Sequence, residues 1–333
     1  MNSTSLLHRR PLRTLSLLAV ITAAGLSGCA SGGQPANDSP TSAPPTSAPP
    51  RGVVTRAEAE KILDHYQEIN NKANRSRNAA LLATVEAGQL YARSKADFEQ
   101  FDTLSAKDKK QAGEPFTFTQ RSFYIPATGN WFAAEASTTG KNHTVMVFEK
   151  SADTGDTWKK VISLFPQQSL PAPTTKDGVA EPTDANTTVG LLAPANVPDA
   201  VEDLFATGGT KDGSKLSHTN DSAKSILTTY KERGNNLGSQ ATVNFFPATP
   251  LHQRVYTLRT DAGVLVIAPL AHKEESLVKN SGLQITPGKT ESVYNRTPRA
   301  LVTDDFQGET VVHLPLQGKP EILAYRYAMV DSR

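Results

Sequence analysis

Carboxylates are the side chains of this 333-residue chain that come closest to a metal-binding pattern. Asp304-Asp305 with Glu309 offers carboxylate oxygens, which Ca²⁺ prefers, but the group lacks the regular ligand spacing of a calcium-binding loop. We therefore expect these acids to form a polar turn between two strands, 299–304 and 309–316.

The histidines give no stronger indication of a metal or catalytic site, because no two of them have zinc-ligand spacing. His272 and Glu275 would lie one turn apart on a helix, and we expect a solvated, charged helix face there. No Gly-x-Ser-x-Gly elbow and no Gly-x-Gly-x-x-Gly fingerprint occurs. The sequence thus predicts no catalytic, cofactor-binding or metal-binding residue, and no cofactor.

The single cysteine, Cys29, follows a segment with the features of an export signal. Three arginines precede an uncharged run, Thr14 to Leu26, which is too short for a helix to span about 30 Å of hydrocarbon. Leu26-Ser27-Gly28-Cys29 resembles the bacterial lipobox, whose cysteine thiol receives diacylglycerol before cleavage. We predict a lipoprotein signal peptide over 1–28 and lipidation of Cys29. The alternative is an ordinary signal peptide, with Cys29 incidental.

A lipidated Cys29 would place the protein at the outer face of the cytoplasmic membrane, in the cell envelope. Its membrane partner would be the bilayer itself, since two acyl chains, such as palmitate, give stable anchoring where one is marginal. Residues 29–52 form a Ser/Thr/Ala/Pro-rich tether with two copies of Thr-Ser-Ala-Pro-Pro. Extended at about 3.1 Å per residue, the tether would reach roughly 60 Å.

Charge and cysteine content exclude two further classes of protein. The chain has 35 basic and 33 acidic residues, but three of the basic residues lie in the leader, which leaves 32 against 33 after it. Such a balance gives no reason to expect a nucleic-acid partner. A single cysteine excludes an internal disulfide framework.

After the tether, the sequence predicts two halves that have the same fold class. Six prolines between 166 and 198 interrupt any regular pattern. We therefore predict an N-terminal domain over 53–166, a Pro-rich linker over 167–196 and a C-terminal domain over 197–333. Each half has helices followed by antiparallel strands, so the fold class is α+β. An internal duplication is an open alternative.

In the first half, Thr55 and Glu58 form a capping box that starts a helix with one apolar face. A short helix over 79–87 and an irregular or helical stretch over 90–104 follow. After Pro115 the pattern changes to strands separated by turn residues: 116–125, 131–138, 144–149 and 157–165. Helices before a meander have the order of NTF2-like or cystatin-like cones.

The second half begins with helices near 198–205 and from Asp221 or Ser222 to Gly234. Strands follow at 241–246, 253–260, 263–270, 299–304, 309–316 and 321–330.

The interior of a cone in the first half would suit a small ligand. Tyr66, Tyr124 and Trp131 are candidate pocket-lining residues, because each carries a polar atom on a large ring. The alternative is that these three rings only fill the core.

One local motif predicts a firm hairpin between two strands of the first half. Ser151-Ala152-Asp153-Thr154-Gly155-Asp156-Thr157-Trp158 resembles the Asp-box of sialidases and other β-propeller proteins. In this structural turn we expect Asp153 to accept backbone hydrogen bonds, Gly155 to take a positive φ and Trp158 to pack beneath the hairpin. A propeller needs the motif in every blade, and the single copy argues against a sialidase.

Several segments together resemble an actinobacterial, streptomycete-type lipoprotein family with a C-terminal domain of unknown function. They are the lipobox, the tether, Tyr66 to Asn71, Asp203 to Gly209 and the ending Tyr325 to Arg333. The resemblance implies an extracytoplasmic lipoprotein with no assigned activity, and therefore no catalytic residues.

Three functions remain open at this point. The first is a non-catalytic binding or interaction module, whose partner would be a small ligand or an envelope protein. The second is a cell-wall or extracellular hydrolase that uses carboxylate acid–base chemistry. The third is a structural or assembly factor of the envelope, for which a large exposed apolar patch would be the sign.

Overall fold

The computed structural model describes residues 51–139 and 143–333. They belong to a folded unit that runs from Pro49 to Arg333. The predicted signal peptide, Cys29 and all but the last two residues of the predicted tether lie outside the described residues, and their roles stay predictions.

The first helix begins at the predicted capping box. Glu58 N donates to Thr55 Oγ1 at 3.2 Å, and Thr55 N donates to Glu58 Oε2 at 2.7 Å. The buried residues of this helix, α1 (Arg56–Ser76), recur every three or four positions and form one face. Three shorter helices follow it: α2 (Ala79–Leu82), α3 (Gly88–Glu99) and α4 (Ala106–Ala112).

The first sheet is an antiparallel meander in chain order. Its strands match the four predicted ones to within two residues at each end: β1 (Phe118–Tyr124), β2 (Trp131–Thr138), β3 (His143–Glu149) and β4 (Lys159–Leu164). The predicted helix over 79–87 stops at Leu82, because the backbone of Val85 and Ala87 instead bonds to Lys160 in β4.

The second sheet has the order β11-β10-β9-β7, and β8 also pairs with β9. Residues 241–247 pair with one stretch of β9 and residues 256–260 with another, so β7 and β8 share one place in the sheet and residues 248–255 interrupt it. The strands are β7 (Ala241–Pro247), β8 (Tyr256–Thr260), β9 (Gly263–Val278), β10 (Leu301–Pro315) and β11 (Glu321–Ser332). The remaining elements are β5 (Thr175–Lys176), β6 (Val179–Ala180), α5 (Val197–Thr207), α6 (Asp221–Glu232), α7 (Glu291–Tyr294) and five short 3₁₀ helices.

Two expectations for polar segments are wrong. Asp304, Asp305 and Glu309 form no turn, because they lie inside the continuous strand β10, which pairs with β9 over its whole length. His272 and Glu275 lie in β9, not on a helix. The error has one physical cause: Glu309 and His272 are buried beside charged or polar partners from distant segments, so their polarity does not mark solvent.

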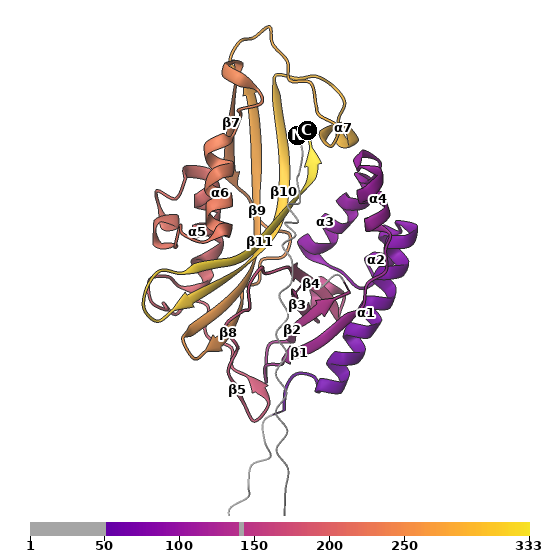
Figure 1. Ribbon diagram of the computed structural model, residues 1–333, viewed down its shortest axis with the longest axis vertical. Helices are drawn as coiled ribbons and strands as arrows, with labels where there is room; N and C mark the ends of the chain where they lie inside the picture. Colours follow the sequence, from indigo (N-terminus) through magenta and orange to yellow (C-terminus); the bar gives the residue numbers. More distant parts are fainter. Residues whose placement is uncertain (1–50, 140–142) are drawn as a thin grey trace, which may run out of the picture. The chain divides into compact units, whose positions relative to one another are not determined.

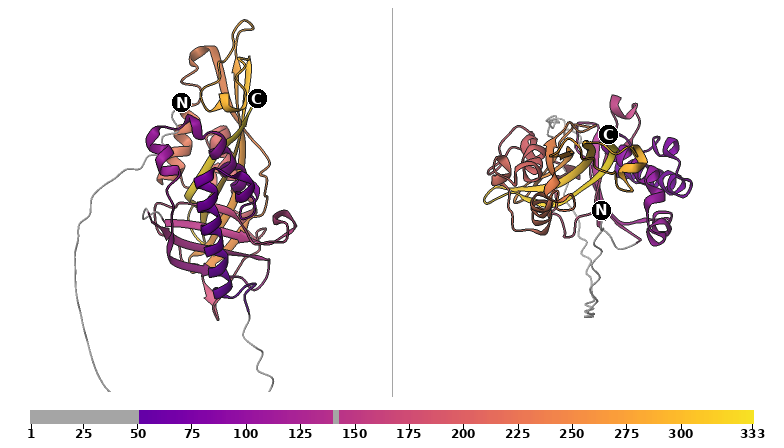
Figure 2. Two further views of the ribbon diagram at one scale, coloured as in Figure 1. Left: turned by 90° about the vertical axis from the view of Figure 1, so that its right-hand side faces the viewer. Right: turned by 90° about the horizontal axis from the view of Figure 1, so that it is seen from above.

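Alternate residues of the strands face opposite sides, and both sides are covered. One core lies between α1 and the first sheet, a second between the two sheets, and a third between the second sheet and α5 and α6. Figure 1 shows α1 (indigo) and α5 with α6 (orange-brown) on opposite sides of the strands, and Figure 2 shows the same order from above. Within residues 51–333 the described chain is therefore a four-layer α/β/β/α arrangement.

The predicted fold class, α+β, is confirmed, since helices cover antiparallel sheets. A cone of the NTF2-like or cystatin-like kind stays a prediction. The division into domains 53–166 and 197–333 also stays a prediction. The core between the sheets nevertheless combines residues from both halves, among them Val147 and Leu265.

This shared core predicts that both halves unfold together. Leu265 is 1% exposed between the sheets, and Leu265→Ala should lower the free energy of unfolding by about 2–5 kcal/mol. Both tryptophans lie in the first half, so their fluorescence reports there on a change made in the second half. We expect equal shifts of the urea midpoint by fluorescence and by circular dichroism. Leu316→Ala, at a 65% exposed position, is the control. An unchanged fluorescence midpoint would show that the halves unfold independently.

Candidate functional site

A cavity of about 330 Å³ lies in the first half, where the second sheet approaches it. Its volume falls in the range of small-molecule pockets. Residues of α1, α3, β1, β4 and β11 line it, and exposed Arg77 and Ala112 mark where it meets solvent. Much of the wall is apolar: Leu90, Phe98, Phe101, Leu104, Phe116, Phe118 and Phe165.

One polar group in the wall is built on α1. Tyr66 and Asn70 lie one helical turn apart, so both side chains point to the same side. The Tyr66 hydroxyl donates to Glu86 Oε1 at 2.7 Å, and Asn70 Nδ2 donates to the Tyr66 hydroxyl at 2.9 Å. Glu86 is 2% exposed, and its Oε2 has no hydrogen-bond partner among the described residues. Burial raises the pKa of the Glu86 carboxyl, and Lys160 offsets part of the rise.

A second polar group joins α3 to the second sheet. Arg93 Nη2 lies 3.0 Å from Glu309 Oε2 on β10, and both side chains are almost fully buried. Arg93 Nε and Nη1 have no hydrogen-bond partner within the described part of the chain. Burial raises the pKa of Glu309, and the guanidinium of Arg93 opposes that rise. Removal of one partner of such a buried ion pair strongly destabilises the fold, because the remaining charge stays buried without a partner.

Lys160 on β4 places an ammonium in the wall, and no carboxylate of the described residues contacts it directly. It is 4% exposed, and its Nζ donates to Ser163 Oγ at 3.2 Å and lies 3.9 Å from the centroid of the Tyr66 ring. No carboxylate lies within 4 Å of Nζ among residues 51–139 and 143–333. Burial lowers the pKa of Lys160 to about 8, against the attraction of Glu86 and Glu309. Within the described chain, the wall therefore holds a buried cation without a carboxylate in direct contact.

Of the predicted pocket residues, the structure places Tyr66 in the wall of this cavity. Trp131 and Tyr124 do not line it. Trp131 packs between the sheets, with its ring centroid 5.0 Å from that of Tyr256. Tyr124 lies on β1, where burial and Glu135 raise the pKa of its hydroxyl to about 12.

The charged residues of the cavity were not predicted from the sequence, although the local sequence pattern indicates that two of them are buried. Lys160 is followed by Val161 and Ile162 in a strand that is apolar on both faces, which leaves no exposed face for it. Arg93 lies three residues from Leu90 and from Ala96, on the buried face of α3. Glu86 stands outside any helix or strand, and no spacing marks it.

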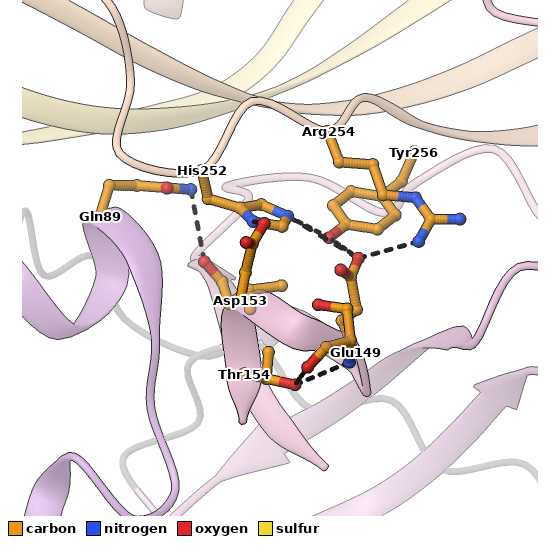
Figure 3. A network of polar contacts seen from close by, with 9 residues as sticks. Gln89, Glu149, Asp153, Thr154, His252, Arg254 and Tyr256 are labelled. Carbon is orange, nitrogen blue, oxygen red and sulfur yellow. Dashed lines mark hydrogen bonds and ion pairs between the residues drawn. The ribbon is translucent and has the colours of Figure 1, made fainter. Parts of the chain in front are cut away.

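A second buried network lies where the interrupted strand β7/β8 meets the first half (Figure 3). Glu149 Oε2, at the end of β3, accepts hydrogen bonds from the Tyr256 hydroxyl at 2.6 Å and Arg254 Nη1 at 3.1 Å. His252 Nε2 lies 2.7 Å from the Tyr256 hydroxyl. A Cβ at Gly88, where α3 starts, would come within 2.7 Å of the His252 Cβ. The network thus fixes residues 252–256 against β3 and against the start of α3, which carries Arg93.

The turn between β3 and β4 borders this network. Gly155 has φ 66°. Thr154, not Asp153, makes the bonds across the turn: Ser151 N donates to Thr154 Oγ1 at 2.8 Å. The Asp153 carboxylate is 80% exposed and lies 3.9 Å from His252 Nδ1 (Figure 3). Trp158 packs on the first sheet, 5.4 Å between its ring centroid and that of Phe132.

Comparison with known proteins gives the family but no activity. The chain belongs to the family described as "Domain of unknown function (DUF8094)", which matches residues 50–333. It is 31% identical over 338 residues to the "Uncharacterized lipoprotein SCO6871" of Streptomyces coelicolor, across 97% of this chain and 95% of that protein. It is also 27% identical to the "Uncharacterized lipoprotein SCO2278" of the same organism, across 81% and 82% of the two chains. The predicted resemblance to streptomycete-type lipoproteins of unknown activity is confirmed.

The described residues contain no helix that is long and apolar enough to cross a membrane. No group of three His, Cys, Asp or Glu side chains among them is arranged to hold a metal ion.

Lys160 predicts a pH dependence of stability. Its pKa of about 8 in the folded chain lies below the value of about 10.4 for a free lysine, so between these pH values the unfolded state binds more protons. The free energy of unfolding should therefore rise with pH across this window, by on the order of 3 kcal/mol from this group. We expect Lys160→Met to lack that rise, measured by urea unfolding at several pH values. The exposed Lys150→Met is the control, and equal pH responses of wild type and Lys160→Met would contradict the prediction.

Proposed function

We propose that this protein is a lipid-anchored, extracytoplasmic binding protein that holds a small ligand in the cavity between α1, α3 and β4. The observation that carries the proposal is the wall itself: apolar rings surround buried charged groups, and some of the polar atoms of these groups have no hydrogen-bond partner among the described residues. Unsatisfied buried polar groups are costly and rare in folded proteins, and a bound polar group would satisfy them. The role is binding without catalysis.

The anchor is part of the proposal. Two relatives are named as lipoproteins and align with most of this chain, which supports lipidation at Cys29 by diacylglycerol. The protein would then stand at the outer face of the cytoplasmic membrane, with the bilayer as its partner.

A hydrolase is the second candidate, favoured by Glu86. A carboxyl whose pKa is raised by burial, next to an ammonium in a cavity, has the properties of a general acid. Glycoside hydrolysis also needs a second carboxyl facing the same bond. The other acid in this wall, Asp97, lies 3.7 Å from Arg326 at the surface. An assembly role in the envelope stays a prediction.

If the cavity holds a ligand, a large side chain placed at its opening should exclude that ligand. Ala112 lines the cavity yet is exposed at the end of α4, so Ala112→Trp should fill the entrance without disturbing buried contacts. We expect wild type from a streptomycete host to carry an extra mass in native mass spectrometry, and Ala112→Trp to lose most of it.

Ala106→Trp is the matched control, because Ala106 is exposed on the same helix and does not line the cavity. If wild type carries no ligand, and no fraction of host metabolites raises its melting temperature, the proposal is wrong. An extra mass that survives equally in Ala112→Trp would place the ligand elsewhere.

For the anchor, we expect Cys29→Ser to lose the acyl mass and to leave the detergent phase in phase partitioning, because the thiol that accepts diacylglycerol is gone. Metabolic labelling with a fatty acid measures the same loss. Retention of label by Cys29→Ser would refute lipidation at this residue.

A further inference from the structure

The charges that line the cavity are unequal. Four cationic side chains line it, Arg77, Arg93, Lys160 and Arg326, against the carboxylates of Glu86 and Asp97. Glu309 adds a third carboxylate from behind the wall, but its ion pair is with Arg93. With Glu309 counted, four cations face three carboxylates among the described residues, an excess of one positive charge.

The four cations differ in how closely a carboxylate approaches them. Arg93 has Glu309 at 3.0 Å, and Arg326 has Asp97 at 3.7 Å. Arg77 is exposed to water and lies over the Phe101 ring. Lys160 is buried, and its direct neighbours are a neutral hydroxyl and an aromatic ring, while the carboxylates of Glu86 and Glu309 attract it from more than 4 Å away. A buried ammonium without an anion in direct contact is unfavourable, and an anionic ligand that contacts it would be stabilised there.

The surroundings of Lys160 restrict the charge and shape of such a ligand. A second negative charge would meet Glu86 and Asp97, so a single charge fits best. The unpartnered Nε–H and Nη1–H groups of Arg93 offer donors to a ligand with two acceptor oxygens. The phenylalanines of the wall suit an apolar body.

We infer that the ligand is an organic monocarboxylate with an apolar body, its carboxylate paired with the Lys160 ammonium. The inference rests on the proposed function, which it deepens by naming the ligand class.

The test compares three molecules with one body and different head groups: 3-phenylpropionate, 3-phenylpropan-1-ol and 3-phenylpropylamine. Binding to the full chain in lipid nanodiscs is measured by calorimetry or ligand-observed NMR, with empty nanodiscs as the blank. We expect the carboxylate to bind about tenfold or more tightly than the alcohol, and the amine to bind least, since a hydrogen bond between two charged groups is stronger than one to a neutral hydroxyl. This comparison needs no variant, so a folding defect cannot mimic its result.

Variants then assign the effect to Lys160. Lys160→Met should remove the preference for the carboxylate over the alcohol, measured as the ratio of the two dissociation constants. Lys159→Met is the control, because Lys159 precedes it on β4, does not line the cavity and donates to Ala83 O.

The outcomes separate the two proposals. If the alcohol or the amine binds as tightly as the carboxylate and Ala112→Trp still blocks binding, the ligand class is wrong and the binding function stands. A preference for the carboxylate that persists in Lys160→Met would also overturn the inference. If no probe binds and the chain from its host carries no ligand, the binding function itself fails.

Discussion

The buried ion pair between Arg93 and Glu309 fixes the part of the structure on which the cavity depends. It joins α3 to β10, two segments more than 200 residues apart in the chain. Removal of either charge would strand the other in an apolar interior, so the two positions can change only together. Because α3 carries both this arginine and part of the cavity wall, the second sheet sets the geometry of a site built mostly by the first half.

Burial of both faces of the second sheet explains why the first part of β9 is apolar almost throughout. Residues 263–272 of β9 are all buried, since even-numbered side chains such as Val266 face the α5 and α6 side while Leu265 and Ile267 face the first sheet. Antiparallel sheets with one face in water would alternate with polar residues instead. The two halves also share an order, helices and then a meander, once β7 and β8 are taken as one interrupted strand.

The features predicted well from sequence were those that local chemistry decides. The capping box at Thr55 starts a helix in any context, and turn residues between apolar runs delimit β1 to β4. The features predicted poorly depend on distant partners. Glu309 was expected in a polar turn because its partner, the guanidinium of Arg93, belongs to a distant segment. Glu86 and Lys160 line the same cavity only in the folded chain, where α1, α3 and β4 lie together. For the candidate site, Tyr66 was the member named from sequence, because an aromatic ring with a hydroxyl is conspicuous without tertiary information.

The way in which the chain enters the fold has a mechanical consequence. Val53 N donates to Pro126 O at 2.8 Å beside β1, and α1 starts at Arg56. If Cys29 is held by a membrane, a pull between the envelope and the domain is applied to this single bond and then along the axis of α1. That helix is held to the first sheet by side-chain packing and a few side-chain bonds, such as that of Gln67 with Phe118 N, whereas the strands are bonded along their length. Tension would therefore unwind α1, which carries Tyr66 and Asn70, before the sheets. A molecule bound against α1 would raise the force at which this helix unwinds.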